Sequence, residues 1–100
     1  MKIQAVVFPR KKIAQLCQRY GVRQLDVFGS LVTGRFTARS DIDILVEYKP
    51  EAHPGFLALA GLQIDLSELL GRKVDLVSKK GLKPIIRDEV LATAKVIYAE

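Results

Sequence analysis

The sequence is poor in the residues that cross-link small domains or keep a chain unfolded. It has one cysteine (Cys17), one histidine, no tryptophan, four prolines and seven glycines among 100 residues. A single cysteine can form neither an intrachain disulfide nor a four-cysteine zinc site, so we expect a reducing compartment, the cytoplasm. With 49% hydrophobic residues and little proline or glycine, a disordered or collagen-like chain is excluded. The composition predicts one compact domain over residues 1–100.

Long apolar runs are also missing. No stretch approaches the roughly 20 apolar residues that a membrane-spanning helix needs. The first residues, Met-Lys-Ile-Gln, lack the apolar segment of a secretory signal peptide. We therefore expect a soluble protein without a membrane partner.

Acidic residues are scarce in the first part of the chain. Residues 1–40 contain eight Lys and Arg but only one acid, Asp26, whereas residues 41–100 contain eight basic and ten acidic residues. The two parts carry +7 and −2, which sum to the net charge of +5. The basic excess fits the solvated face of a helix, or a surface for an anionic ligand or acidic partner. Direct nucleic-acid binding is disfavoured, because this stretch offers no exposed aromatic side chains for base stacking.

Hydrophobic periodicity predicts an α/β (α+β) fold, with a small mixed sheet of three to four strands flanked by helices. The predicted helices cover residues 9–20, 59–69 and 84–91, the last with Ile85, Ile86 and Val90 facing inward. The predicted strands cover residues 23–28, 42–48, 73–77 and 94–98. A full helix connects the second and third strands, which are expected to be parallel neighbours. The shorter connection between the first two favours an antiparallel pair.

Three carboxylates occupy positions where strands are normally apolar. Asp41 and Asp43 are two residues apart, so they project to the same side while Ile42 and Ile44 face the core. Asp75 lies in the next predicted strand and comes beside Asp43 if the two strands are parallel. Clustered carboxylates repel one another unless a cation neutralises them. Oxygen ligands alone favour Mg²⁺ or Mn²⁺, and a pair of such ions can assist in-line phosphoryl transfer.

A glycine-serine turn ends the first predicted strand. Gly29 lets backbone N–H groups approach a phosphate closely, and the Ser30 hydroxyl can donate a further hydrogen bond. Arg35, in the connection that follows, places positive charge near the phosphate path. Either feature alone is common, since Gly-Ser is often only a turn and Asp-x-Asp often a surface loop. Their combination with a third carboxylate on the next strand favours a phosphoryl-transfer site.

These motifs resemble those of the minimal nucleotidyltransferases, small members of the DNA polymerase beta superfamily. The similarity rests on Val27-Phe28-Gly29-Ser30, ten intervening residues whose last is Ser40, and then Asp41-Ile42-Asp43-Ile44-Leu45-Val46. The segment from Leu69 to Val77, which contains Asp75, resembles the strand that carries the family's third carboxylate. The similarity extends to residues 91–100 and so spans nearly the whole chain. One position differs: the family usually has an arginine before the glycine that matches Gly34, and this chain has Thr33.

The resemblance implies a nucleotidyltransferase fold and the transfer of AMP from ATP to a protein hydroxyl. By this resemblance Asp41, Asp43 and Asp75 hold two Mg²⁺ ions, and Asp75 also helps to activate the acceptor. Gly29 and Ser30 hold the β- and γ-phosphates of ATP, with Ser40 beside them and Arg35 in place of the missing arginine. Family members of this size commonly act as antitoxins, which silence a HEPN-domain ribonuclease by attaching AMP to one of its tyrosines.

A second interpretation is an antitoxin that binds the same partner but does not transfer AMP. An antitoxin with vestigial carboxylates would neutralise its partner by occluding it, and Thr33 motivates this alternative. Apolar residues near Phe36 and Phe56 are expected to be exposed and to support a homo- or hetero-oligomeric interface.

Overall fold

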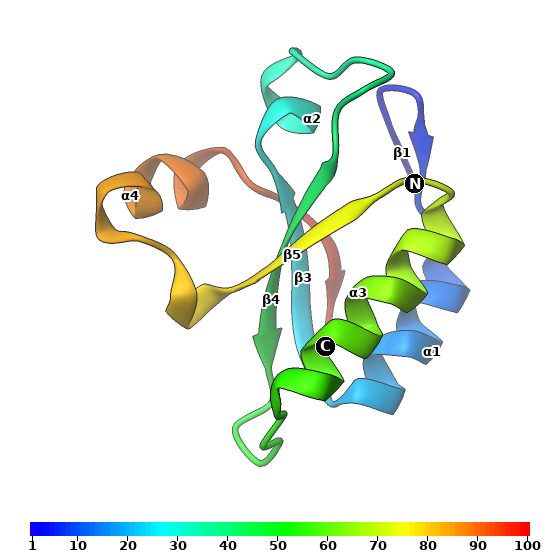
Figure 1. Ribbon diagram of the computed structural model, residues 1–100, viewed down its shortest axis with the longest axis vertical. Coiled ribbons are helices and arrows are strands. Elements are labelled where there is room, and N and C mark those ends of the chain that lie inside the picture. Colours follow the sequence, from blue (N-terminus) through cyan, green and yellow to red (C-terminus); the bar gives the residue numbers. More distant parts are fainter.

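A four-stranded mixed sheet with two long helices on one face forms the body of the protein (Figure 1). The computed structural model describes residues 1–100. A hairpin of β1 (Lys2–Ile3) and β2 (Val6–Val7) precedes the first helix. The elements that follow are α1 (Arg10–Tyr20), β3 (Val22–Phe28), α2 (Ser30–Thr33), β4 (Ile42–Tyr48), α3 (Phe56–Leu70), β5 (Val74–Ser78), the 3₁₀ helix η1 (Lys79–Gly81), α4 (Pro84–Thr93) and β6 (Lys95–Ala99).

The strands lie in the order β5-β4-β3-β6. Strand β3 is antiparallel to both β4 and β6, whereas β4 and β5 are parallel and are connected through α3. Both predicted strand orientations are therefore confirmed, and so is the mixed α/β fold class. The physical reason is connection length: a parallel crossover needs about a dozen residues and usually a helix, which only the second connection provides in full.

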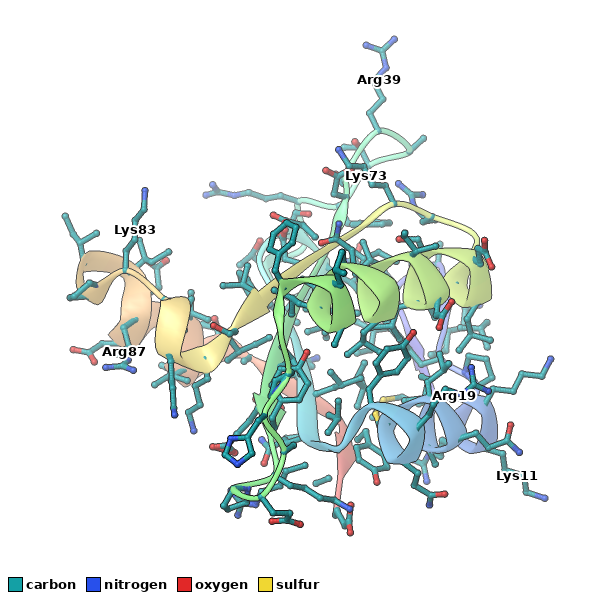
Figure 2. All side chains as sticks on the ribbon, turned by 60° about the horizontal axis from the view of Figure 1, so that its bottom comes forward. Lys11, Arg19, Arg39, Lys73, Lys83 and Arg87 are labelled. Atoms are coloured by element: carbon teal, nitrogen blue, oxygen red, sulfur yellow. The ribbon has the colours of Figure 1, made fainter.

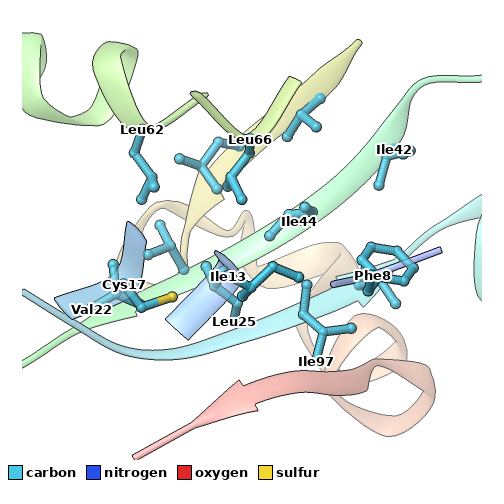
Figure 3. Close-up of a cluster of buried hydrophobic side chains, with 14 of the residues drawn as sticks. Phe8, Ile13, Cys17, Val22, Leu25, Ile42, Ile44, Leu62, Leu66 and Ile97 are labelled. Carbon is cyan, nitrogen blue, oxygen red and sulfur yellow. The ribbon is translucent and has the colours of Figure 1, made fainter. Parts of the chain in front are cut away.

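The hydrophobic core lies between the sheet and the pair α1 and α3 (Figure 3). Alternate side chains of β4, Ile42, Ile44 and Val46, are fully buried on this face. From the helices, Cys17 of α1 and Leu66 of α3 pack into the same cluster. Because strand side chains alternate, the residues between the buried ones point to the other face of the sheet, which neither α1 nor α3 covers. That face, which we call the open face, carries the polar residues of β3, β4 and β5 and also Leu45, which is 3% exposed.

Helix α4 does not pack as predicted. Of the three residues expected to face inward, Ile85 is 89% exposed, Ile86 is also exposed and only Val90 is half-buried; α4 contributes no fully buried side chain. The apolar residues of this segment do recur at helical spacing, but no other helix or sheet packs against them. Figure 1 shows α4 standing apart from the sheet and from the pair of α1 and α3. Leu82, immediately before the helix, is buried and is where this part of the chain is anchored.

Two further details differ from the sequence-based expectations. The hairpin β1–β2 was not predicted, and its two-residue strands are too short to give a periodic signal. Phe36 was expected to be exposed but is half-buried, because the guanidinium of Arg72 lies over its ring, 4.4 Å from the ring centre. Phe56, at the start of α3, is 81% exposed as expected.

No helix in the structure is both long enough and apolar enough to cross a membrane. The longest, α3, has 15 residues. This agrees with the lack of long apolar runs in the sequence.

Cys17 should be inert in the folded protein. Its side chain is fully buried, and burial together with the negative charge of Glu100 raises the pKa of the thiol to about 12. Only the thiolate reacts with alkylating reagents. We therefore expect no labelling by iodoacetamide at pH 8 in the native state and complete labelling after denaturation, as measured by intact mass. Rapid labelling of the native protein would contradict the packing of α1 on the sheet.

Candidate active site

Asp43 lies at the centre of the candidate site, because β4 is hydrogen-bonded to a neighbour on each side. In the antiparallel pair its register partner is Phe28, the last residue of β3. In the parallel pair its register partner is Asp75 of β5. The sheet therefore brings together the Gly29 turn that follows Phe28 and the two carboxylates. Asp43 itself is only partly exposed, since its strand neighbours Ile42 and Ile44 are both buried.

The three carboxylates affect one another electrostatically. The pKa of Asp43 is raised above its ordinary value, first by burial and then by the negative charges of Asp75 and Asp41. Asp75 is exposed on the same open face. Asp41 lies just before β4 and its carboxylate is 3.8 Å from the ammonium group of Lys73. The surroundings of Asp43 disfavour its negative charge, so a cation beside it would be stabilised.

The ligand atoms of these residues are of the type that binds a divalent metal ion. Carboxylate oxygens on adjacent strands are the hard ligands that Mg²⁺ prefers, and Mg²⁺ usually takes only one or two protein carboxylates, with water and phosphate completing its shell. The carboxylates are not drawn into a closed cage: no group of three His, Cys, Asp or Glu side chains is placed so that it could hold a metal ion by itself. Such an open arrangement leaves room for substrate oxygens in the coordination sphere.

Gly29 lies directly against the carboxylate of Asp43. Its φ of +71° and ψ of −144° are accessible to glycine and strained for other residues. A Cβ atom at this position would overlap Oδ2 of Asp43. After the turn, α2 is a single turn of helix, in which the amides of Val32 and Thr33 donate to the carbonyl of Gly29. The turn thus brings the backbone of Gly29 into contact with the carboxylate, with no side chain between them.

The connection from α2 to β4 contains the other predicted site residues. Arg35 is exposed, and its amide donates to the carbonyl of Ser30 at 3.1 Å. The hydroxyl of Ser40 accepts a hydrogen bond from the amide of Thr37 at 2.9 Å, so it helps to shape this loop. Thr33 is exposed at the end of α2. The guanidinium of Arg35 is thus free to move in solvent, whereas Ser40 already has a partner within the loop.

Arg72 holds this connection in place and was not singled out in the sequence. Its Nη2 atom lies 3.0 Å from the carbonyl oxygens of Thr37 and Ala38 and 2.6 Å from that of Ser40. The guanidinium also stacks on Phe36. A planar group with several donors can serve several carbonyls at once, which an ammonium group cannot do. The available signal was only an arginine shortly before the Asp75 strand, and nothing local indicates that it reaches a loop more than thirty residues away.

Comparison with known proteins places this geometry in context. The family model described as nucleotidyltransferase domain matches residues 9–97. The chain is 41% identical over 97 residues to the protein adenylyltransferase MntA of Thermococcus cleftensis, an alignment that covers 97% of this chain and 92% of that protein. The similarity therefore includes both strands that carry the carboxylates and the turn between β3 and α2.

Solved structures share the fold. A candidate minimal nucleotidyltransferase is 39% identical, with a TM-score of 0.70 over 85% of each chain. A toxin–antitoxin structure with AMP-PNP superposes with a TM-score of 0.73 at 24% identity, covering 93% of this chain and 75% of that chain. A tri-AMPylated HEPN toxin of Shewanella oneidensis in complex with MNT antitoxin gives 0.63 at 22% identity, covering 91% and 70%. At these two lower identities the similarity concerns the fold alone.

Replacing Gly29 by alanine should disrupt the site more than the same change at Gly34. Both residues have positive φ, so both substitutions strain the backbone, by about 1–3 kcal/mol. Only at Gly29 does the added Cβ meet Asp43, whereas nothing lies within 4 Å of a Cβ at Gly34. We expect Gly29→Ala to weaken Mn²⁺ binding, measured by calorimetry, and Gly34→Ala to leave it near the wild-type value. Equal affinity in the two variants would show that the turn does not position the carboxylate.

Replacing Arg72 by lysine should loosen the loop before Asp41. A single ammonium group cannot reach three carbonyls and stack on Phe36, so the amides of residues 36–41 should exchange with solvent about tenfold faster, measured by hydrogen–deuterium exchange with mass spectrometry. Lys73→Ala is the control at the neighbouring position, because that side chain is 77% exposed and its ammonium group forms one ion pair, with Asp41 at 3.8 Å. Similar exchange rates in both variants would show that contacts other than those of Arg72 order the loop.

Proposed function

The chain belongs to the nucleotidyltransferase domain family, as an MNT-type nucleotidyltransferase, and from this membership we propose that it transfers AMP from ATP to a hydroxyl group of a protein. The observation that carries the proposal is the position of Asp43, which lies against the Gly29 turn on one side and in register with Asp75 on the other. A phosphate-binding turn and two metal-binding carboxylates are the minimum that such a transfer requires.

ATP would bind with its β- and γ-phosphates at the Gly29 turn. The turn offers backbone N–H groups and the Ser30 hydroxyl at a point where no side chain obstructs a phosphate. Arg35 is exposed on the following segment and can extend its guanidinium towards the triphosphate. Ser40 would act by shaping the loop through its bond to Thr37. Arg72 would keep this loop, and therefore Asp41, at a fixed distance from the turn.

Asp41, Asp43 and Asp75 would hold two Mg²⁺ ions, or Mn²⁺ in their place. When bound, the ions neutralise the charge of the triphosphate and of the reacting oxygens. The chain's own part is to place carboxylate oxygens from two adjacent strands on one side of the α-phosphate. The raised pKa of Asp43 supports this role, since an anionic cluster that is costly by itself favours cation binding.

The transfer itself would proceed by in-line displacement. The acceptor oxygen forms a bond to the α-phosphorus as the bond between that phosphorus and the β-phosphate oxygen breaks, and pyrophosphate leaves. The proton of the acceptor hydroxyl passes to the carboxylate of Asp75, which is exposed and so accessible to a protein substrate. Because the open face of the sheet is not covered by α1 or α3, a side chain of another protein can reach this position.

We propose a tyrosine of a HEPN-type ribonuclease toxin as the acceptor, with this chain as its antitoxin. The support is the relatedness to MntA and the shared fold with an MNT antitoxin that is in complex with a tri-AMPylated HEPN toxin. The shared fold with a toxin–antitoxin complex that contains AMP-PNP supports ATP as the donor. Both partners of such a pair would meet in the cytoplasm.

Asp43→Asn should abolish AMP transfer without unfolding the protein. Loss of a metal-binding carboxylate should lower the rate at least about 100-fold, measured as label from α-³²P-ATP incorporated into a co-expressed HEPN-type protein. The unfolding temperature at pH 7 should be unchanged or higher. The pKa of Asp43 is raised in the folded state, so its ionised form disfavours folding above the ordinary pKa of a carboxyl group, and the amide removes that repulsion.

The matched control is Glu68→Gln, the same carboxylate-to-amide change at an exposed position of α3. It should leave transfer at the wild-type rate. If Asp43→Asn still neutralises the toxin as well as the wild type does, inhibition by occlusion, the alternative that Thr33 motivates, replaces AMP transfer as the function. If wild-type protein transfers no label to a HEPN-type protein, the proposed acceptor is wrong.

A further inference from the structure

A second surface lies at the other end of the strands that carry the carboxylates. Its cavity has a volume of about 710 Å³ and is bounded by the end of β4, the 50–55 loop, the start of α3, η1 and α4. We call it the β4–α4 groove. Glu47, on its wall, is four residues beyond Asp43 on β4, which corresponds to about 13 Å along an extended strand. The groove is thus separate from the candidate active site and has no role in the transfer described above.

The lining of the β4–α4 groove is strongly basic. It carries one acidic side chain against five Lys and Arg side chains, Arg23, Lys49, Lys79, Lys80 and Arg87. Glu47 is already bound by Arg23 at 2.9 Å and by Lys79 at 3.5 Å, and Lys49 is bound by Glu100 outside the groove at 2.9 Å. Lys80 and Arg87 form no ion pair. The groove therefore has two unpaired cations and a net positive charge that only an anionic partner can balance.

A polar group enclosed in the wall of the groove also lacks a partner. Tyr48, the last residue of β4, lines the cavity, and its hydroxyl is buried without a hydrogen bond. Leaving a buried hydroxyl unpaired costs on the order of 1–3 kcal/mol, so such groups usually have a function or a missing partner.

The rim of the groove is apolar and unpartnered. Phe56, which lines it, is 81% exposed, and the adjacent Leu57 is 84% exposed. Helix α4 contributes Arg87 to the lining; its exposed apolar residues Ile85, Ile86 and Leu91 lie outside the groove, and it buries none of its side chains. Aliphatic side chains add nothing to the binding of a phosphate backbone, but they bury well against the apolar face of a helix. Charge and apolar surface together favour a protein segment over a nucleic acid.

We propose that the β4–α4 groove is a docking site for an acidic amphipathic helix of a partner protein. Carboxylates of that helix would pair with Lys80 and Arg87, and its apolar face would cover Phe56 and the exposed side of α4. Figure 2 shows Arg87 projecting from α4 and, far from it on α1, Lys11. The two basic regions are separate, so the docking surface is distinct from the basic first helix.

The test uses the full chain and a defined probe. The probe is a fluorescein-labelled peptide of about 18 residues, long enough to form a helix, with Glu and Leu at helical spacing. Its affinity is measured by fluorescence anisotropy for wild type and for the double variant Lys80→Glu/Arg87→Glu. The matched control, Lys11→Glu/Lys12→Glu, makes the same charge change at exposed positions of α1. A second variant, Phe56→Ser, tests the apolar rim without any change of charge.

We expect saturable binding to wild type that weakens with salt, falls about tenfold or more in the groove variant and changes less than about twofold in the control. Phe56→Ser should also weaken binding. A peptide with Lys in place of Glu should not bind. The proposal is overturned if wild type does not bind the acidic peptide, or if both charge variants lose affinity equally.

Two other occupants are distinguished in the same experiment. If a single-stranded oligonucleotide binds the groove more tightly than the acidic peptide, the site is for nucleic acid and the proposal is wrong. If sedimentation shows a dimer that the groove variant dissociates, the occupant is a second copy of this chain, which also overturns it. Asp43→Asn should bind the peptide like wild type, so failure of the transfer reaction and failure of this docking site are separable.

Discussion

The register of β4 with its two neighbours is the constraint on which the candidate site depends. One strand must satisfy a hydrophobic core and an anionic site together, and it does so because successive side chains point to opposite faces. Ile42 and Ile44 are buried against α1 and α3, while Asp43 between them faces away. A slip of one residue would exchange the faces, burying a carboxylate and exposing two isoleucines. The hydrophobic core therefore fixes the position of the carboxylate, and backbone pairing on both sides of β4 fixes what lies next to it.

The second constraint is the absence of a side chain at Gly29. The turn after β3 and the carboxylate of Asp43 come so close that a Cβ atom would not fit between them. This proximity is useful only if the chain between them is held, because the connection from α2 to β4 has no strand or core contact of its own apart from half-buried Phe36. Arg72 supplies that order from the segment that leads into β5, with three carbonyl contacts and a stacked ring. The turn, the loop and the carboxylates are thus tied to three consecutive strands of one sheet.

Helix α4 has the apolar spacing of a packed helix, but the fold leaves it unpacked. Its apolar residues are spaced as in a packed helix, yet they remain exposed, since the sheet's core face is already occupied by α1 and α3. The apolar side chains of α4 therefore have no partner. The neighbouring groove contains the unpaired cations Lys80 and Arg87, and the Tyr48 hydroxyl in its wall has no hydrogen bond. The candidate active site and the proposed groove thus lie at opposite ends of β4 and β5, the first acidic and the second basic.

The sequence alone determined those features that depend on neighbouring residues. The alternation in residues 42–48 predicted that Asp43 faces the other side of the sheet from Ile42 and Ile44. The lengths of the connections predicted the strand directions, and the spacing from Gly29 to Asp43 indicated the family. Only the tertiary structure decided that Asp43 is in register with Asp75, that Gly29 touches its carboxylate, that Arg72 reaches the loop before Asp41 and that α4 remains uncovered. The reason is physical. Periodicity and turn preferences act within a few residues, whereas register, side-chain reach and the partner of an apolar face depend on segments that are distant in the chain and meet only when the sheet is complete.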